Sequence, residues 1–449
     1  MLPESMLENA SCLRRMAVRK MEGRILIKGG RVIDPASGRD AMADVLLDHG
    51  KIKAVGRIGK PGKARVLSAK GLIVAPGLID LHVHLREPGD EQEETIASGS
   101  AAAVAGGITS VVCMANTKPP CDSEAAAEYV ILQGARAGLA NIFPVGAVTK
   151  RREGQELAEI GQLARAGAVA FSDDGDPIQS AEVMRRALEY AAMFGRPIIT
   201  HAEDHDLSAG GVMNEGAVSM ALGLQGVPAA SEEIAVGRDI RLAEMTSGHL
   251  HVAHVSTAGS VALVREAKAR GAQVTCEVTP HHLTLTEESV RSFDTAYKMN
   301  PPLRTREDVE ACVAGLVDGT IDAIATDHAP HSAEEKELEF PSAPNGVIGM
   351  ETMLGVCATE LVGRRGMSWN DLLARMTVNP ARVMGLSKGT LAVGADADVV
   401  LIDPDMAWTV DRARFVSRSR NCPFHGWKLT GRAVATLVGG GVKWQLAVR

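Results

Sequence analysis

The stretch LIDLHVHL, at residues 78–85, is an apolar run that becomes polar towards its carboxyl end. Seven similar runs follow it, and stretches rich in Ala and Glu, of helical length, lie between them. These runs are ITSVVCMAN (108–116), IFPVGAVT (142–149), AVAFSDD (168–174), PIITHAED (197–204), LHVAHVST (250–257), VTCEVTPHH (274–282) and IDAIATDHAPH (321–331). Each run is typical of a strand buried in a parallel sheet.

Eight strand and helix repeats over about 300 residues predict an α/β fold, a closed (β/α)8 TIM barrel, which takes ~250 residues before insertions. An open doubly wound sheet is the alternative. It is disfavoured because no GxGxxG follows the first strand and no GxxxxGK[ST] occurs in the chain. We place the barrel at residues 77–386. The helix candidates are 94–105, 123–137, 181–194, 232–246 and 260–270.

The sequence pattern at the two ends of the chain differs from the pattern in the middle. Short β-branched runs interrupted by Gly and Pro fill residues 22–76, as in ILIKGGRVIDP, and return in residues 387–449, as in GTLAVGADADVVLIDP. We therefore predict one small β-sandwich domain built from both ends. Residues 1–21 carry no such pattern and are expected to form a flexible tail.

Composition excludes several classes of protein. With 45% hydrophobic and 23% charged residues, the 449-residue chain should fold, and it is too long for one ordinary core. A net charge of −7 gives no electrostatic reason to bind nucleic acid. Seven scattered cysteines without a CxxC pair argue against a disulfide framework and against a thiolate zinc site. No apolar stretch predicts a signal peptide or a membrane span, so a cytoplasmic protein is expected.

Residues of the kinds that bind zinc gather at the carboxyl ends of five of the eight runs. In a barrel, these ends meet on the face that carries the active site. A lone histidine in an apolar run is more often a hydrogen-bonded core residue, Asp174 suits a turn in SDDG, and Asp327 could cap a helix. For the set as a whole, coincidence is a poor explanation. The candidate ligands are His82, His84, Asp174, His201, His254 and Asp327.

The HxH pair at His82 and His84 is the clearest of these signals. Residues two apart in a strand point to the same side, so we expect both imidazoles inside the barrel and the alternate residues, such as Leu81 and Val83, outside against helices. An exposed strand could carry HxH by chance, but unpaired imidazoles are costly to bury. Six ligands are too many for one zinc and suit two ions that share a carboxylate, for which Asp174 is placed.

Nine motifs in a fixed order carry a family resemblance over nearly the whole chain. They are GGRVIDP, APGLIDLHVHLREPG, MANTKPP, FSDDG, HAED, HVST, KMNPPLR, TDHAPH and GTLAVGADADVVLIDP. In order and spacing the chain resembles the amidohydrolase superfamily and, within it, the long-chain bacterial dihydroorotases. The resemblance implies a metal-dependent hydrolase barrel. It further implies an enzyme of de novo pyrimidine biosynthesis that interconverts N-carbamoyl-L-aspartate and L-dihydroorotate.

The resemblance also implies roles for particular residues. His82, His84 and Asp327 would hold one zinc, His201 and His254 a second, and Asp174 would bridge the two. We expect Asp327 to carry the proton between the attacking water and the amide nitrogen. Arg86 offers a bidentate fork for the substrate carboxylate, although a salt bridge to Glu87 or Asp80 is the alternative. The expected substrate-binding residues are His84, Arg86, Asn116, Asn300, His331, Asn345 and Gly346.

Two rival functions remain at this point. Hydantoinases and allantoinases resemble this chain but use a carboxylated lysine at the end of the fourth strand, where FSDDG has none; Lys150 is a remote substitute and is better explained as a surface residue. A catalytically silent scaffold for aspartate carbamoyltransferase is the second rival, and it would be expected to have lost metal ligands. A homo-oligomer or a complex with aspartate carbamoyltransferase is compatible with the active enzyme.

Overall fold

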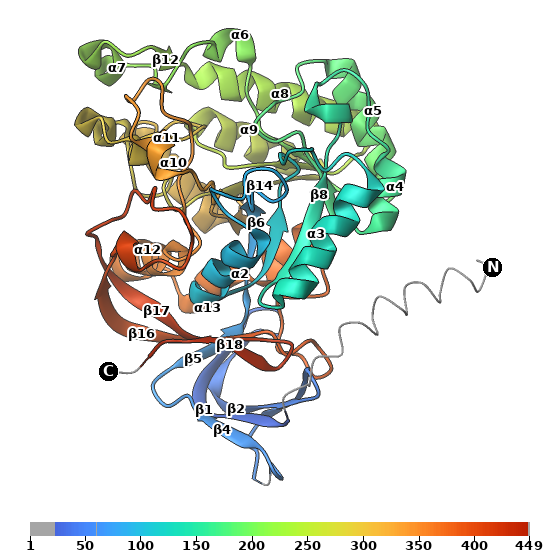
Figure 1. The fold of residues 1–449 in the computed structure, drawn as a ribbon, viewed down its shortest axis with the longest axis vertical. Coiled ribbons are helices and arrows are strands. Elements are labelled where there is room, and N and C mark those ends of the chain that lie inside the picture. Colours follow the sequence, from blue (N-terminus) through green and yellow to red (C-terminus); the bar gives the residue numbers. More distant parts are fainter. Residues whose placement is uncertain (1–22, 60, 448–449) are drawn as a thin grey trace, which may run out of the picture.

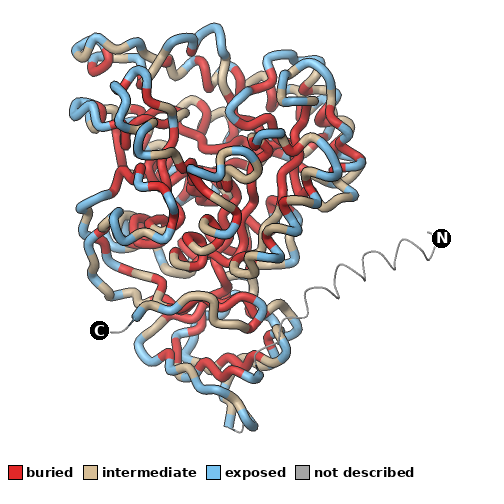
Figure 2. Tube along the Cα trace, in the orientation of Figure 1, coloured by how far each residue is buried: buried red, intermediate tan, exposed pale blue. Residues whose placement is uncertain are grey.

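The computed structural model describes residues 23–59 and 61–447, so the expected tail at 1–21 lies outside the described residues. A barrel wrapped in helices lies above a sheet that is built from strands of both ends of the chain (Figure 1). The most deeply buried segments run through the centre of the barrel (Figure 2). No helix of the described part is long and apolar enough to cross a membrane.

Eight parallel strands form the barrel, and all eight predicted strands are confirmed. They pair in chain order, and the ring closes through a parallel bridge between Val83 and His328. Most strands end before their polar residues, which begin the loops at the mouth. The strands are β6 (Leu78–Val83), β7 (Ile108–Cys113), β8 (Asn141–Gly146), β9 (Ala170–Phe171), β10 (Ile198–Thr200), β13 (Leu250–Val252), β14 (Val274–Val278) and β15 (Ala323–Ile324).

The helices between the strands begin at capping residues that the sequence supplies. Thr95, Ser123, Ser180 and Thr257 each accept a hydrogen bond from the backbone N–H three residues on. The apolar faces of these helices pack on the outside of the barrel in one large core. The main helices are α2 (Ile96–Ala105), α3 (Glu124–Ala137), α4 (Ile160–Ala166), α5 (Ala181–Ala192), α8 (Ala229–Thr246), α9 (Ala258–Ala269), α10 (Arg306–Asp318), α12 (Met353–Cys357), α13 (Trp369–Met376) and α14 (Val378–Val383).

Short elements fill the longer loops above the barrel. The connection from β10 to α8 is an insertion with its own two-stranded sheet, which the sequence did not predict because each of its strands has two residues. Beyond β15, a π-helix at Ala358–Arg364 continues α12. The short elements are η1 (Lys150–Arg152), α6 (His205–Ser208), β11 (Met213–Asn214), α7 (Ala217–Leu222), β12 (Gly226–Val227), η2 (Glu287–Ser292), η3 (Thr295–Tyr297), α11 (Ala333–Lys336) and η5 (Arg412–Arg414).

The prediction that Leu81 packs outward is wrong. Leu81 lies inside the barrel with Val112 and Met114, in a core that α14 closes from below. Val83 does face the helices, as predicted, and so does Leu85. A register shift in the pairing of β6 with β7, after Asp80, breaks the strict alternation. Because of this shift, one strand supplies apolar residues to the barrel interior and ligands to its mouth.

The prediction that both ends of the chain build one β domain is confirmed, and their strands belong to a single sheet. The order is β18-β17-β16-β5-β1-β2-β3, with β4 paired to β1, and the ends meet where β5 pairs antiparallel with β16. Its apolar core combines residues from both ends, Ile27 and Val74 with Val399 and Leu437. The strands are β1 (Ile25–Asp34), β2 (Arg39–Asp48), β3 (Lys51–Gly56), β4 (Arg65–Ser68), β5 (Ile73–Pro76), β16 (Val399–Thr409), β17 (Lys428–Val438) and β18 (Gly441–Gln445).

Candidate active site

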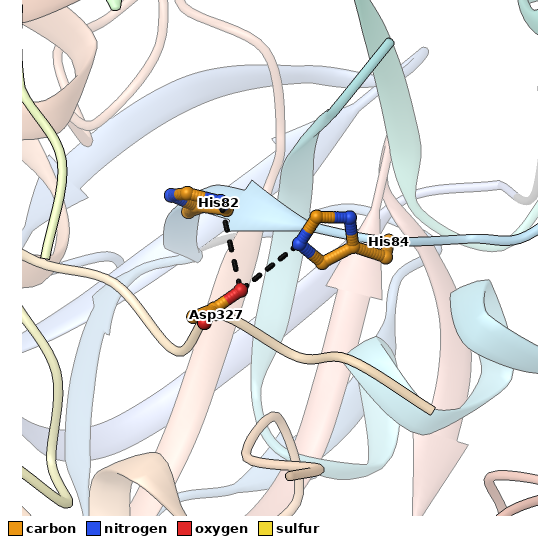
Figure 3. Close-up of side chains that lie close together, drawn as sticks. All are labelled: His82, His84 and Asp327. Atoms are coloured by element: carbon orange, nitrogen blue, oxygen red, sulfur yellow. Dashed lines mark hydrogen bonds and ion pairs between the residues drawn. The ribbon is translucent and has the colours of Figure 1, made fainter. Parts of the chain in front are cut away.

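The six predicted ligands meet at the barrel mouth. His82 and His84 extend from β6 towards Asp327, which follows β15 (Figure 3). The Asp327 Oδ1 atom lies 2.9 Å from Nε2 of His84 and 3.6 Å from Nε2 of His82. On the opposite strands, Nδ1 of His201 lies 3.0 Å from Nε2 of His254. Five strands far apart in sequence therefore deliver one cluster.

Asp174 lies among all four histidines. Its Oδ1 atom is 3.3 Å from Nε2 of His82. The same oxygen is 3.6 Å from Nδ1 of His201 and 3.8 Å from Nε2 of His254. Its Oδ2 atom is 3.6 Å from Nε2 of His84. One carboxylate thus faces both pairs of imidazoles, which is the position that a bridging ligand requires.

The charges in this cluster balance each other. Burial raises the pKa of Asp174, but the charge of His82 and the nearby imidazoles of His201 and His254 outweigh it and hold that pKa well below its usual range. Burial likewise opposes ionisation of Asp327, and His82 and His84 hold its pKa well below the usual range. Both carboxylates are therefore ionised at neutral pH. Two buried negative charges next to imidazole nitrogens attract a cation, which would compete with protons for those nitrogens.

Three of the four imidazoles have a hydrogen-bond acceptor on the nitrogen that faces away from the cluster. Nδ1 of His82 lies 2.9 Å from Oε1 of Glu277, and Nδ1 of His84 lies 2.8 Å from Oδ1 of Asn116. Nε2 of His201 lies 3.1 Å from Oε2 of Glu203. An acceptor at the far nitrogen fixes the tautomer whose near nitrogen is free to bind a metal.

The residues fit a metal ion on their own chemistry. Nε2 of His82 and Oδ1 of Asp174 are buried, and neither forms a hydrogen bond within the described residues. A buried polar atom without a partner is costly, and a cation between these two atoms would satisfy both. Imidazole nitrogens with carboxylate oxygens are the ligands that zinc accepts. His82, His84 and Asp327, and likewise His82, Asp174 and His254, place one ligand atom each within 4.8 Å of one another.

A pocket of about 210 Å³ opens directly onto this cluster. Five of the six predicted ligands line it, and His82 lies beneath them. All seven residues expected to bind substrate also line it: His84, Arg86, Asn116, Asn300, His331, Asn345 and Gly346. The structure thus brings together every predicted site residue.

Arg86 has a partner that the sequence did not predict. Its Nε lies 2.8 Å from Oε2 of Glu93 and donates to the carbonyl of Pro330, and neither Glu87 nor Asp80 pairs with it. The Arg86 side chain is 13% exposed, so its charge is only partly screened by water. Burial raises the pKa of Glu93 to about 7, with Arg86 acting in the opposite direction. Arg86 therefore keeps positive charge that a substrate anion could meet.

Sequence reasoning missed the carboxylates behind the ligands. Glu277 is 1% exposed within β14, and Glu203 follows His201 by two residues. A charged residue inside the apolar run VTCEV was the available signal for Glu277. Lys150, the remote candidate for a bridging group, is 44% exposed and pairs with Glu156. Lys150 is therefore better explained as a surface residue.

The histidines at the mouth without a predicted role hold loops. His282 contacts Thr279 and the carbonyl of Pro301 through its two ring nitrogens. The Nδ1 atom of His328 accepts a hydrogen bond from the backbone N–H of Gly349. His281 is buried against His282 and does not line the pocket.

Comparisons with known proteins agree with this geometry. The model of the amidohydrolase family matches residues 73–443. A dihydroorotase from Pelotomaculum thermopropionicum is 54% identical over 94% of this chain and 99% of its own length. One from Anaeromyxobacter sp. (strain K) is 53% identical over 94% and 98%. Among solved structures, the L-hydantoinase (dihydropyrimidinase) from Arthrobacter aurescens superposes with a TM-score of 0.84 at 28% identity, covering 94% of this chain and 97% of that one.

Proposed function

Since this chain belongs to the amidohydrolase family, and within it to the dihydroorotases, we propose that it interconverts N-carbamoyl-L-aspartate and L-dihydroorotate in pyrimidine biosynthesis. The observation that carries this proposal is the position of Asp174, within 4 Å of all four histidines at the base of a pocket that also contains Arg86. A cyclic amide that carries a carboxylate matches both features.

The metal centre would hold two zinc ions. His82, His84 and Asp327 would bind one ion, His201 and His254 the other, and Asp174 would contribute one oxygen to each. Bound zinc would act as a Lewis acid that polarises the amide carbonyl and lowers the pKa of water, so that a nucleophile is available near neutral pH.

Asp327 would carry the proton. It lies on the pocket wall, and its ionised carboxylate can accept a proton from the attacking water and pass it to the departing ring nitrogen. In the direction of ring closure, the same oxygen would remove a proton from the carbamoyl nitrogen. The Asp327 Oδ1 atom lies 2.9 Å from Nε2 of His84, so the carboxylate is placed at the cluster.

The substrate carboxylate would bind at the opposite side of the pocket. Arg86 supplies the charge, and Asn116 and the neutral His331 supply hydrogen bonds; burial and Arg86 lower the pKa of His331 to about 3. Asn300 and the backbone at Asn345 and Gly346 would surround the ring. Because the pocket lining contains no Phe, Tyr or Trp, recognition would depend on charge and hydrogen bonds.

A hydantoinase or allantoinase activity is less well supported. The Asp174 carboxylate lies between the two pairs of histidines, where a bridging ligand would be needed, whereas Lys150 pairs with Glu156. We also propose a cytoplasmic location, because the six described cysteines are all free and buried, as expected in a reducing compartment. A homo-oligomer or a complex with aspartate carbamoyltransferase would be compatible with this activity, and size measurement with and without that enzyme would test it.

The deciding experiment compares L-dihydroorotate, hydantoin and allantoin as substrates of the zinc-loaded protein. We expect turnover of dihydroorotate and at least about a hundredfold lower kcat/KM for the two rings without a carboxylate. Arg86→Ala should lower kcat/KM for dihydroorotate far more than for hydantoin. Comparable rates on all three rings would contradict the proposal, and the absence of turnover with metal bound would favour the scaffold.

A further inference from the structure

A chain of hydrogen-bonded side chains runs beneath the metal cluster, through the interior of the barrel. It starts at His249, just before β13, and passes through Thr275, His251 and Glu277 to His82. Its last three members are each at most 1% exposed. None of the other predicted ligands is connected to the lower part of the barrel in this way by the hydrogen bonds of the described residues.

The direction of each hydrogen bond in this chain follows from counting donors. Glu277 lies 2.9 Å from Nδ1 of His82 and 3.2 Å from Nε2 of His251, and a carboxylate can only accept. Both imidazoles therefore donate to it.

Counting donors and acceptors in the same way gives the direction of the two hydrogen bonds below His251. Because His251 donates from Nε2, its Nδ1 accepts from the Thr275 hydroxyl, 2.9 Å away. That hydroxyl in turn accepts from Nε2 of His249, also at 2.9 Å. Every donor of the lower links then has one acceptor, and burial lowers the pKa of His249 to about 4. No link of the chain has to reverse when a metal binds above it.

We propose that Glu277 is a positioning residue for the metal centre. Its carboxylate holds the proton of His82 on Nδ1 and so keeps Nε2 free, facing Asp174 and Asp327, where a metal would bind. The lower links, through His251 and Thr275, fix the carboxylate in turn. The inference rests on the proposed function, because it presupposes that His82 is a metal ligand.

A pair of substitutions on one strand tests the proposal. Glu277→Gln keeps the side-chain shape but removes the charge and one of two acceptor oxygens, so it cannot accept from both imidazoles. Thr275→Val, two residues earlier on β14, removes a link further from the metal and leaves Glu277 in place. We expect Glu277→Gln to raise the Kd for zinc by about 10- to 100-fold and Thr275→Val by less than about fivefold.

Two readouts separate positioning from general loosening of the barrel. Zinc affinity is measured by competition with a chelator, and the visible spectrum of the cobalt-substituted protein reports ligand geometry at the site. We expect a changed cobalt spectrum in Glu277→Gln and a spectrum like that of the unsubstituted protein in Thr275→Val. Melting of the metal-free proteins gives the stability cost of each substitution separately.

The outcomes are distinct. A zinc Kd for Glu277→Gln within threefold of the original would overturn the inference, as would equal losses of affinity in the two variants. If Glu277→Gln does not fold, His251→Gln replaces it as the test. This variant leaves the Glu277 carboxylate in place but removes the hydrogen bond from His251, and it should weaken zinc binding by about tenfold. Unchanged zinc affinity in His251→Gln would also overturn the inference. If the unsubstituted protein binds no zinc, the proposed function itself fails.

Discussion

The two halves of the candidate metal cluster contain similar residues but are built differently. In the first half (His82, His84 and Asp327), both imidazoles have an acceptor behind them, and one of these, Glu277, is fully buried. In the second half (His201 and His254), His201 has the partly exposed Glu203, whereas Nδ1 of His254 has no hydrogen bond within the described residues. The first half also has a carboxylate of its own. The support behind the candidate ligands therefore differs between the halves, and we expect metal affinity to differ with it.

Removing the shared carboxylate should have the largest effect. Asp174→Asn takes one oxygen ligand and one negative charge from both halves, so we expect activity to fall by at least about a thousandfold, which corresponds to ~4 kcal/mol of transition-state stabilisation. Metal content and kcat/KM would be measured on the same preparation. Retention of two tightly bound ions and full turnover would show that Asp174 is not the bridge.

Stepwise removal of metal should separate the halves. We expect a chelator to remove one ion from the second half first, with Kd values about tenfold or more apart, because the first half has an additional carboxylate and better supported imidazoles. His254→Ala should abolish the weak step and leave the strong one. A single step, or loss of the tight step in His254→Ala, would mean that the halves are equivalent.

Glu203→Gln should act on the second half alone. The substitution removes the charge behind His201 but leaves an amide oxygen that can still accept, so we expect about a tenfold weaker second ion and an unchanged first ion. Chelator titration measures the affinities of the first and second ions separately. Equal weakening of both ions would indicate that Glu203 acts through Asn300, to which it is also hydrogen-bonded, rather than through His201.

Lys150→Met should have the smallest effect. The lysine is exposed and lies in a surface ion pair, so we expect activity within about twofold of the original and no measurable change in stability. Activity at saturating bicarbonate and zinc provides the check. A large loss of activity would instead favour a carboxylated Lys150 as the bridging ligand in place of Asp174.

The parts of the molecule that follow from periodicity could be predicted from the sequence. The eight apolar runs predicted the barrel, and the polar residues at their ends predicted the cluster of six candidate ligands, because parallel strands in a barrel carry their carboxyl ends to one face. Leu81 was misplaced since a register shift between two strands leaves no trace in the alternation of one of them. The pairing of His82 with Glu277 joins the first and seventh strands, and no local pattern encodes which side chains meet across a barrel.

Both ends of the chain contribute to the sheet below the barrel, and this affects how the protein can be synthesised. Until residues 399–409 leave the ribosome, the edge of β5 that pairs with β16 has no partner, although the barrel residues between them are already made. An open strand edge can pair with another chain. Translation that stops before β16 should therefore yield an aggregation-prone product even where the whole barrel sequence is present.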